Sequence, residues 1–146
     1  MNLKYSWCNL ASMSKFERCP CDSKTMYHKC CKRFHDGLLP ENALLLMRSR
    51  YSAYAFKLAD YIMETTHPDH PEYSENREQW KLSIQEFCSQ TRFDRLKILE
   101  FIDGPETVSA TFTAYLRQAD QDVSFTEKSL FVKESGRWLY KSGEML

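Results

Sequence analysis

The segment TVSATFTAYL, residues 107 to 116, alternates apolar and polar side chains along its length. One face consists of Val108, Ala110, Phe112, Ala114 and Leu116. Successive side chains of a β-strand point to opposite faces, so this segment predicts a strand that buries one face against a core. The other face, with Thr107, Ser109, Thr111, Thr113 and Tyr115, fits either a solvated sheet surface or a surface that pairs two copies in a homodimer.

Three further segments with strand character surround this one. RLKILEFI, residues 95 to 102, precedes it and is separated from it by the turn sequence Asp103-Gly104-Pro105. SFTEKSLFVK, residues 124 to 133, follows it, and Ser135-Gly136 leads into RWLYK, residues 137 to 141. Four strands in succession, joined by short connections, predict an antiparallel meander.

Two helices are predicted before the strands. Asn42 is a suitable N-cap for a helix whose apolar residues recur every three or four positions, and Pro68 and Pro71 close this segment. The apolar stripe consists of Leu44, Met47, Tyr51, Tyr54, Ala55, Leu58 and Ile62. A second helix is expected from about Glu75 to Cys88, with the stripe Trp80, Ile84, Phe87 and Cys88. Cys88 is therefore expected to be a core thiol.

Helices followed by strands predict an α+β domain over residues 40 to 146. We expect two to three helices packed on a curled, antiparallel four-stranded meander. Because the meander is rich in aromatic residues, it must curve over the helices to bury them. The result is a cone with a pocket at its open end, and such pockets are preferred places for small ligands.

The overall composition excludes several classes of protein. Apolar residues make up 42% of the 146, which is enough for a core that needs no disulfides. The 20 basic and 20 acidic residues cancel, which argues against non-specific nucleic-acid binding. No apolar run approaches the roughly 18 residues of a membrane span, and the N-terminus lacks an apolar block of the signal-peptide type. We therefore expect a cytoplasmic protein. A natural start at Met13 would make residues 1 to 12 extraneous.

The segment CPCDSKTMYHKCC, residues 19 to 31, holds four of the six cysteines. Clustered cysteines in a cytosolic chain more often bind metal than form disulfides, and zinc takes four thiolates in a tetrahedron. The predicted ligands are Cys19, Cys21, Cys30 and Cys31, which would form a closed, structural site. His28 and His35 are reserve ligands, because the adjacent Cys30 and Cys31 need not both reach one metal. Two disulfides or four free thiols are the alternatives.

The same segment resembles the SEC-C motif, a small zinc knuckle found at the C-terminus of the SecA translocation ATPase and in many other bacterial proteins. The usual motif is Cys-Pro-Cys-Gly-Ser-Gly-Lys, then a tyrosine, here Tyr27, and then Cys-Cys or Cys-His. The resemblance implies the same four cysteine ligands. Asp22, Lys24 and Thr25 stand where Gly, Gly and Lys are usual, which matters if the turn needs a positive φ. Residues 14 to 36 are named the knuckle below.

Two longer blocks extend the resemblance over residues 19 to 143. They are LMRSRYSAYAFKLADYIMETTHP, residues 46 to 68, and KSLFVKESGRWLYKSG, residues 128 to 143. Together with the knuckle they resemble the YchJ-like family of bacterial proteins. Members of that family join a SEC-C knuckle to a domain of the nuclear-transport-factor-two-like (NTF2-like) fold. The resemblance therefore implies a fold and a metal, but it implies no activity.

Arg48 is the main candidate for a residue of the pocket. It falls at the border of the apolar stripe, where a guanidinium either binds an anion, closes a structural ion pair or extends into water. Arg50 lies further round the helix and is expected to be solvated or paired on the surface. The other candidates for the pocket are Tyr51, Tyr54, His67 and Trp138. No phosphate loop, nucleophile elbow, HExxH motif or clear acid–base pair is found in the sequence, which argues against an enzyme.

The observations favour a zinc-binding adaptor whose knuckle docks a protein partner. The similar knuckle of SecA contacts other proteins and the ribosome, so the resemblance implies a protein partner, such as a ribosome-associated one. A small-molecule-binding or catalytic protein that uses the pocket is the first alternative. A nucleic-acid-associated zinc protein is the second. The knuckle has six basic and three acidic residues and a zinc tetrathiolate contributes −2, which leaves only +1 to attract a nucleic acid.

Overall fold

A computed structural model of the chain describes residues 17–146. Cys8, Met13 and the first three residues of the knuckle, 14 to 16, lie outside the described residues. The elements in chain order are the 3-10 helix η1 (Tyr27–Lys29), the helices α2 (Lys32–His35), α3 (Ala43–Ala55), α4 (Ala59–Glu64) and α5 (Arg77–Gln90), and the strands β1 (Arg92–Ile102), β2 (Thr107–Gln118), β3 (Gln121–Asp122), β4 (Phe125–Glu134) and β5 (Arg137–Met145).

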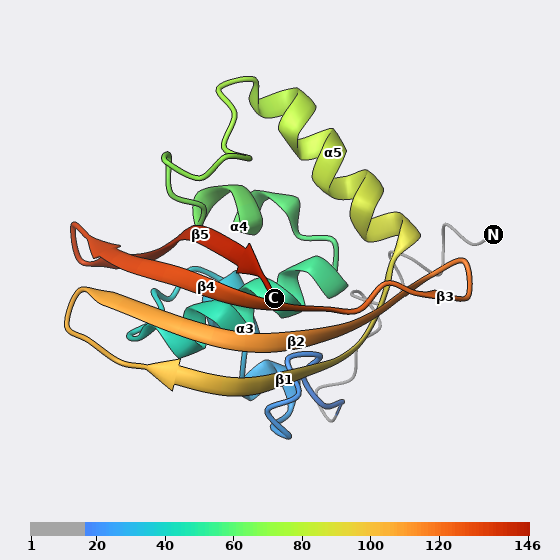
Figure 1. The fold of residues 1–146 in the computed structure, drawn as a ribbon, viewed down its shortest axis with the longest axis horizontal. Coiled ribbons are helices and arrows are strands. Elements are labelled where there is room, and N and C mark those ends of the chain that lie inside the picture. Colours follow the sequence, from blue (N-terminus) through green and yellow to red (C-terminus); the bar gives the residue numbers. More distant parts are fainter. Residues whose placement is uncertain (1–16) are drawn as a thin grey trace.

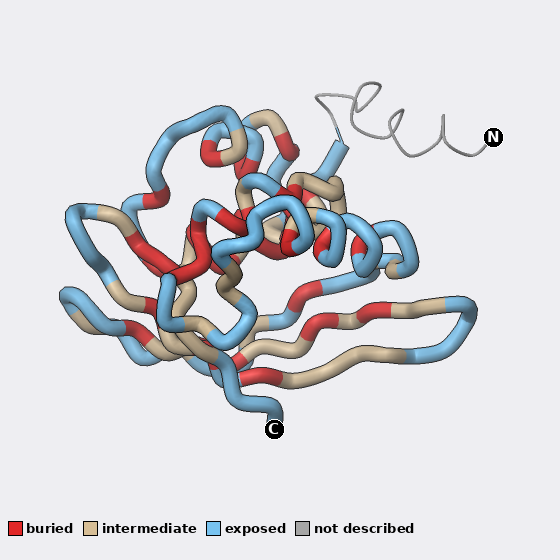
Figure 2. The backbone as a smooth tube through the Cα atoms, turned by 90° about the horizontal axis from the view of Figure 1, so that it is seen from above, coloured by how far each residue is buried: buried red, intermediate tan, exposed pale blue. Residues whose placement is uncertain are grey.

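The strands form one antiparallel sheet in the order β1-β2-β4-β5, with the short β3 paired to β2. Helices α3, α4 and α5 lie on one side of this curled sheet, as Figures 1 and 2 show from two directions. The predicted α+β meander with two to three helices is therefore confirmed. We refer to residues 42 to 146, which form α3 to β5, as the cone.

Irregularities in the ladder accompany the curvature of the sheet. The pairing shifts register between Phe93 and Arg95 and between Ile98 and Glu100 in β1, and between Leu130 and Phe131 in β4. A β-bulge bends its strand and increases the local twist. Beyond the second shift in β1, Phe101 packs on the core with Ile98, whereas an even alternation from Ile98 would bring Glu100 to that face.

Asn42 caps α3 as predicted, because its side chain accepts a hydrogen bond from the Leu45 amide (2.9 Å). The prediction of one helix that continues to Ile62 is wrong. Two bonds end α3 in a Schellman motif: Leu58 N–H donates to the Ala53 carbonyl (2.8 Å) and Lys57 N–H to the Tyr54 carbonyl (3.1 Å). Lys57 has a φ of 62°, and glycine is the usual residue at such a position. The sequence therefore contains no glycine signal for the end of this helix.

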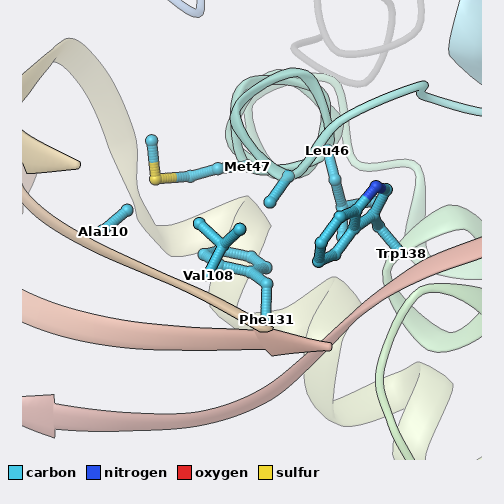
Figure 3. Close-up of a cluster of buried hydrophobic side chains, with 7 residues drawn as sticks. Leu46, Met47, Val108, Ala110, Phe131 and Trp138 are labelled. Atoms are coloured by element: carbon cyan, nitrogen blue, oxygen red, sulfur yellow. The ribbon is translucent and has the colours of Figure 1, made fainter. Parts of the chain in front are cut away.

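The main apolar core lies between α3 and the sheet (Figure 3). Leu46 and Met47 of α3 pack on Val108, Ala110, Phe131 and Trp138 from the strands. A second cluster joins α3, α4 and α5 and includes Ala53, Ile62, Trp80, Ile84 and Cys88. Burying one large apolar side chain contributes about 1.5–3 kcal/mol, so these clusters hold the helices on the sheet. Among residues 17–146, no helix combines the length and apolar character that a membrane span requires.

Candidate metal centre and central cavity

The knuckle begins with a tight turn between its first two cysteines and η1. Cys19 N–H donates to the Thr25 carbonyl (2.8 Å), and Asp22 N–H donates to the Cys19 carbonyl (3.2 Å). Asp22 and Lys24 have φ angles of 65° and 72°. These are the two positions at which the usual motif has glycine. The turn does need positive φ, and this chain meets the need with Asp22, a residue type that tolerates the left-handed region, and with Lys24, which is strained there.

The four cysteines of the knuckle converge on one point. Their sulfurs all lie within 4.8 Å of one another, and the residues are 0 to 7% exposed. The Cys21 and Cys30 sulfurs are 3.6 Å apart, and those of Cys30 and Cys31 are 3.9 Å apart. A tetrahedral site with metal–sulfur bonds of about 2.3 Å has sulfur–sulfur edges of about 3.8 Å. The cluster therefore has the size of a tetrathiolate metal site, and the adjacent Cys30 and Cys31 both take part.

Hydrogen bonds among the thiols shift their pKa values in opposite directions. The bond with Cys19 lowers the pKa of Cys30 and of Cys21, whereas the bond with Cys21 raises the pKa of Cys19. The pKa of Cys31 is also raised, chiefly by its bond with Cys19. Without a cation, the group can therefore hold only some of its members as thiolates, because like charges disfavour ionisation. Four ionised sulfurs at these distances suit a soft divalent metal such as zinc.

Arg48 supports this cluster and does not line the cavity, which corrects its predicted position. Its Nη1 donates to the Cys21 carbonyl oxygen (2.7 Å) and lies 3.9 Å from the Cys21 sulfur. Ser23 Oγ lies 3.2 Å from the Cys30 sulfur. Polar groups around metal-bound thiolates stabilise their negative charge and fix their orientation. Arg48 on α3 therefore ties the cone to the candidate metal centre.

The two reserve ligands do not join the cysteine group. His35 Nε2–H donates to the Ser49 carbonyl (2.9 Å), which leaves Nδ1 to accept from the Tyr27 hydroxyl (2.8 Å). Burial lowers the pKa of His35, in keeping with this neutral tautomer. His28 Nδ1 is buried without a hydrogen-bond partner among the described residues, but His28 is not part of the cluster. His35 therefore fastens the knuckle to α3.

A cavity of about 1070 Å³ opens between α3, α5 and the inner face of the sheet; we refer to it as the central cavity. Tyr51 and Tyr54 line it, as the sequence predicted. Tyr51 donates its hydroxyl hydrogen to the Arg95 carbonyl (2.9 Å), and burial raises its pKa above the ordinary value. Apolar and aromatic side chains form most of the wall, and its polar side chains come from α3, from α5 and the loop before it, and from β4 and β5.

His67 and Trp138 were predicted to line the pocket, and the structure places both elsewhere. Trp138 packs in the core against α3 (Figure 3). His67 is 5% exposed and lies in the segment that adds to the edge of β5. Its Nε2 donates to Glu134 (2.8 Å), while Nδ1 accepts from the Asp69 amide (2.9 Å). His67 thus closes a loop, and its ring has no free nitrogen for a ligand.

Arg50, Glu127 and Tyr140 line the cavity and were not predicted to do so. Arg50 was expected to be solvated or paired on the surface, but it is 7% exposed, because α3 is covered on more than one side. The small residues Ser49, Ser52 and Ala53, all 0% exposed, mark this second packed face and were the available signal. For Glu127 the signal was its place on the face Phe125-Glu127-Ser129-Phe131, where a carboxylate points inward with two aromatic rings.

The fold and the cysteine cluster together define the class: an NTF2-like α+β cone that carries a SEC-C-type knuckle before its first long helix. The family model for the middle NTF2-like domain of YchJ matches residues 42–143. A UPF0225 protein of Bordetella pertussis is 38% identical over 133 residues, covering 87% of this chain and 92% of its own. A UPF0225 protein of Haemophilus influenzae is 35% identical over 133 residues, with coverages of 90% and 80%. The chain belongs to the YchJ-like family.

Solved structures agree with this assignment. The solution structure of a SEC-C motif protein from Rhodopseudomonas palustris has a TM-score of 0.75 and 31% identity, and the match covers 88% of this chain and 98% of that one. The crystal structure of a SEC-C motif protein from Psychrobacter arcticus has a TM-score of 0.72 at 23% identity, covering 87% and 81%. At that identity, the second structure supports the fold alone.

Proposed function

We propose that the protein is a zinc-binding adaptor in which one structural zinc shapes the knuckle and the knuckle docks a protein partner. The observation that carries this proposal is the group of four buried thiols with tetrahedral dimensions. All four corners are protein sulfurs, so no position is left for a substrate or an activated water. Closed sites of this kind contribute folding energy, and they leave function to the surface that they shape.

The outer surface of the knuckle supports a protein partner. Its exposed basic residues are Arg18, Lys24, Lys29, Lys32 and Arg33. Lys24 pairs with Asp22 (2.9 Å) and Lys32 pairs with Asp36 (2.6 Å), so the charge is mixed and only locally positive. Such a surface suits an acidic patch on a protein better than the phosphate backbone of a nucleic acid. The resemblance to the SecA knuckle favours a ribosome-associated protein as this partner.

Elemental analysis tests the identity of the metal and the number of metal ions per chain. Protein purified without added metal should contain about one zinc per chain, since the cluster offers one set of four ligands. Cys21→Ser and Cys30→Ser should lose most of it. Cys88→Ser is the matched control, because Cys88 is buried in the cone outside the cluster. Retention of zinc by both knuckle variants, or stoichiometric iron in place of zinc, would refute the assignment.

Co-sedimentation with bacterial ribosomes and affinity capture test the partner. The zinc-loaded protein should bind, and a Lys29→Glu, Lys32→Glu variant that keeps its zinc should bind at least tenfold more weakly, because the repulsive charges oppose the acidic patch. Lys97→Glu, at an exposed site on β1, is the control for charge alone. Equal binding by all three proteins, or by the zinc-free protein, would contradict docking through the knuckle.

A further inference from the structure

The central cavity contains a buried carboxylate, Glu127, of which only one oxygen accepts hydrogen bonds from the described residues. Glu127 of β4 is 8% exposed. Its Oε2 accepts hydrogen bonds from Ser129 Oγ and from the Tyr140 hydroxyl, the latter at 2.7 Å. Its Oε1 has no hydrogen-bond partner within residues 17–146, and it is not sealed off from the cavity surface. One carboxylate oxygen is therefore fixed by the protein, and the other is available to a ligand.

Arg50 provides a buried base in the same cavity. Its Nη1 donates to the Ile62 carbonyl (3.1 Å), Thr65 Oγ1 (2.7 Å) and Thr66 Oγ1 (3.1 Å). For Nε and Nη2, no hydrogen-bond partner is found in the described part of the chain, and neither atom is sealed from solvent. The guanidinium is thus held in place through one nitrogen, while two donors remain for a ligand.

Tyr140 keeps the two charges apart. The Arg50 guanidinium lies over its ring, 4.6 Å from the centroid, while its hydroxyl bonds to Glu127. No ion pair joins Arg50 to Glu127 among residues 17–146. Two buried opposite charges that served only stability would gain by direct contact. Here neutral groups hold the Arg50 guanidinium and the Glu127 carboxylate separately, which is the arrangement expected of a preorganised site for a ligand with two charges.

Gly143 of β5 leaves room for this arrangement. A Cβ atom at this position would collide with the Glu127 carboxylate and the Tyr140 hydroxyl. Aromatic rings form much of the remaining wall and include Tyr54, Phe87, Phe93, Phe112, Phe125 and Phe131. Further polar side chains, among them His70, Glu72, Gln79 and Ser83, come from α5 and the loop before it. The cavity thus offers one fixed positive group, one fixed negative group and a large aromatic surface.

We propose that the central cavity binds a small zwitterion with a large apolar body, whose carboxylate is held by Arg50 and whose ammonium group is held by Glu127. A planar carboxylate matches the paired donors of a guanidinium, and an ammonium group fits the open carboxylate oxygen and the faces of the tyrosine rings. The two buried charges of the site balance, which matches a zwitterion better than a simple anion or cation, and the other carboxylate of the wall, Glu72, is exposed. This site lies outside the knuckle and is independent of the adaptor function.

The volume sets the size of the ligand. A cavity of about 1070 Å³ exceeds the space that a single amino acid fills, so apolar dipeptides are the appropriate probes. The dipeptide Phe-Leu has both charges. Its N-acetyl form lacks the ammonium group, and its C-terminal amide lacks the carboxylate. All three share the side chains of Phe and Leu, and each capped form lacks one of the two charges.

Calorimetric titration of the full-length protein with these three probes tests the proposal. Phe-Leu should bind at least tenfold more tightly than either capped form, because each capped form loses one charge-assisted hydrogen bond. Equal affinity of the three probes, or failure of Phe-Leu to bind, would overturn the proposal. This part of the experiment requires no variant and therefore no assumption about folding.

Two conservative variants assign the charges. Glu127→Gln keeps an acceptor for Ser129 and Tyr140 and should bind Phe-Leu and its N-acetyl form with equal affinity. Arg50→Lys keeps the charge but loses the paired donors, and it should weaken Phe-Leu at least fivefold while leaving the C-terminal amide unaffected. Arg48→Met is the matched control, since Arg48 contacts the knuckle and should leave all three affinities unchanged. Unaltered discrimination in Glu127→Gln would overturn the assignment of the ammonium site.

Discussion

Between residues 17 and 36, the knuckle buries four thiols and only two aromatic side chains, Tyr27 and Phe34. The cone buries apolar side chains from three helices and four strands, in three clusters that each include a residue of α3. Two hydrogen bonds, from His35 to the Ser49 carbonyl and from Arg48 to the Cys21 carbonyl, join it to the knuckle, together with the aromatic edge contacts of Tyr27 with Phe56 and of His35 with Tyr61. The knuckle is thus a small unit with almost no core of its own, attached to a unit that has one.

This difference has a physical consequence. Apolar burial stabilises the cone whether or not a metal is bound, whereas, under the proposed function, a segment of about 20 residues without a core would depend on bound metal for its order. Damage to either part should therefore stay in that part.

Phe131→Ala should have the largest effect, because Phe131 is the largest fully buried side chain among the described residues. We expect a loss of about 3–5 kcal/mol of unfolding free energy, from lost apolar burial and the cavity left behind. Leu82→Ala, at a side chain on α5 that is 61% exposed, is the control and should change stability by less than about 0.5 kcal/mol. Denaturant unfolding measures both. Zinc content of the folded variant should not change, and a parallel loss of zinc would contradict the separation.

His35→Ala should loosen the attachment of the knuckle. It removes the bonds to Ser49 and Tyr27 and the edge contact with Tyr61, at a cost of about 1–3 kcal/mol. The metal should remain, because His35 is not part of the cysteine cluster. Limited proteolysis between residues 36 and 42 should become faster. Tyr27→Phe, which removes only one of the two bonds, should have a smaller effect, and metal loss in His35→Ala would contradict a role limited to attachment.

Arg48→Met should weaken zinc binding by about tenfold, since the groups around metal ligands typically affect affinity by 10–100-fold. The apolar stem of Arg48 is kept, while the donor to Cys21 is lost. Competition with a chromophoric chelator gives the affinity. Arg50→Met, two positions along the same helix, should leave zinc affinity unchanged. The reverse result, with Arg50 affecting zinc and Arg48 affecting dipeptide binding, would exchange the roles given to the two arginines.

Lys24→Gly should have the smallest effect and the opposite sign. Lys24 has a φ of 72°, and glycine relieves strain there at the cost of greater freedom in the unfolded chain. A gain of up to about 1 kcal/mol in the metal-bound knuckle is expected, seen as tighter zinc binding. The exposed pair of Lys24 with Asp22 is worth little. Lys29→Gly, at a residue of η1 without positive φ, should give no gain, and weaker zinc binding by Lys24→Gly would argue against strain in the turn.

Much of the fold could be predicted because its signals are local. The alternation of residues 107 to 116 gives β2, the Asn42 cap gives the start of α3, and the spacing of the cysteines gives their convergence. The end of α3 before Lys57 could not be predicted. The residue that takes the left-handed conformation after a helix is usually glycine, and here it is a lysine. The bulges of β1 could not be predicted either, since they depend on how the sheet curves over the helices.

The cavity was located correctly in the fold, but its charged residues were not. Arg48 was assigned to the cavity on the assumption that α3 has one apolar stripe and one solvated face. The knuckle covers the side of Arg48, and the segment after α4 covers the side of Arg50. Which of two nearby arginines enters the cavity is therefore decided by tertiary contacts that lie 15 to 27 residues away in the sequence. Periodicity alone cannot contain that information.

Hydrogen exchange of the zinc-loaded protein, before and after removal of the metal by a chelator, tests the central claim most directly. If the knuckle depends on its metal and the cone on its packing, amide protection should be lost in residues 17 to 36 and at the knuckle-facing turn of α3. Protection in β2, β4 and α5 should stay as it was. If chelation instead deprotects those elements together with the knuckle in one cooperative step, the two parts are a single folding unit and the account is wrong.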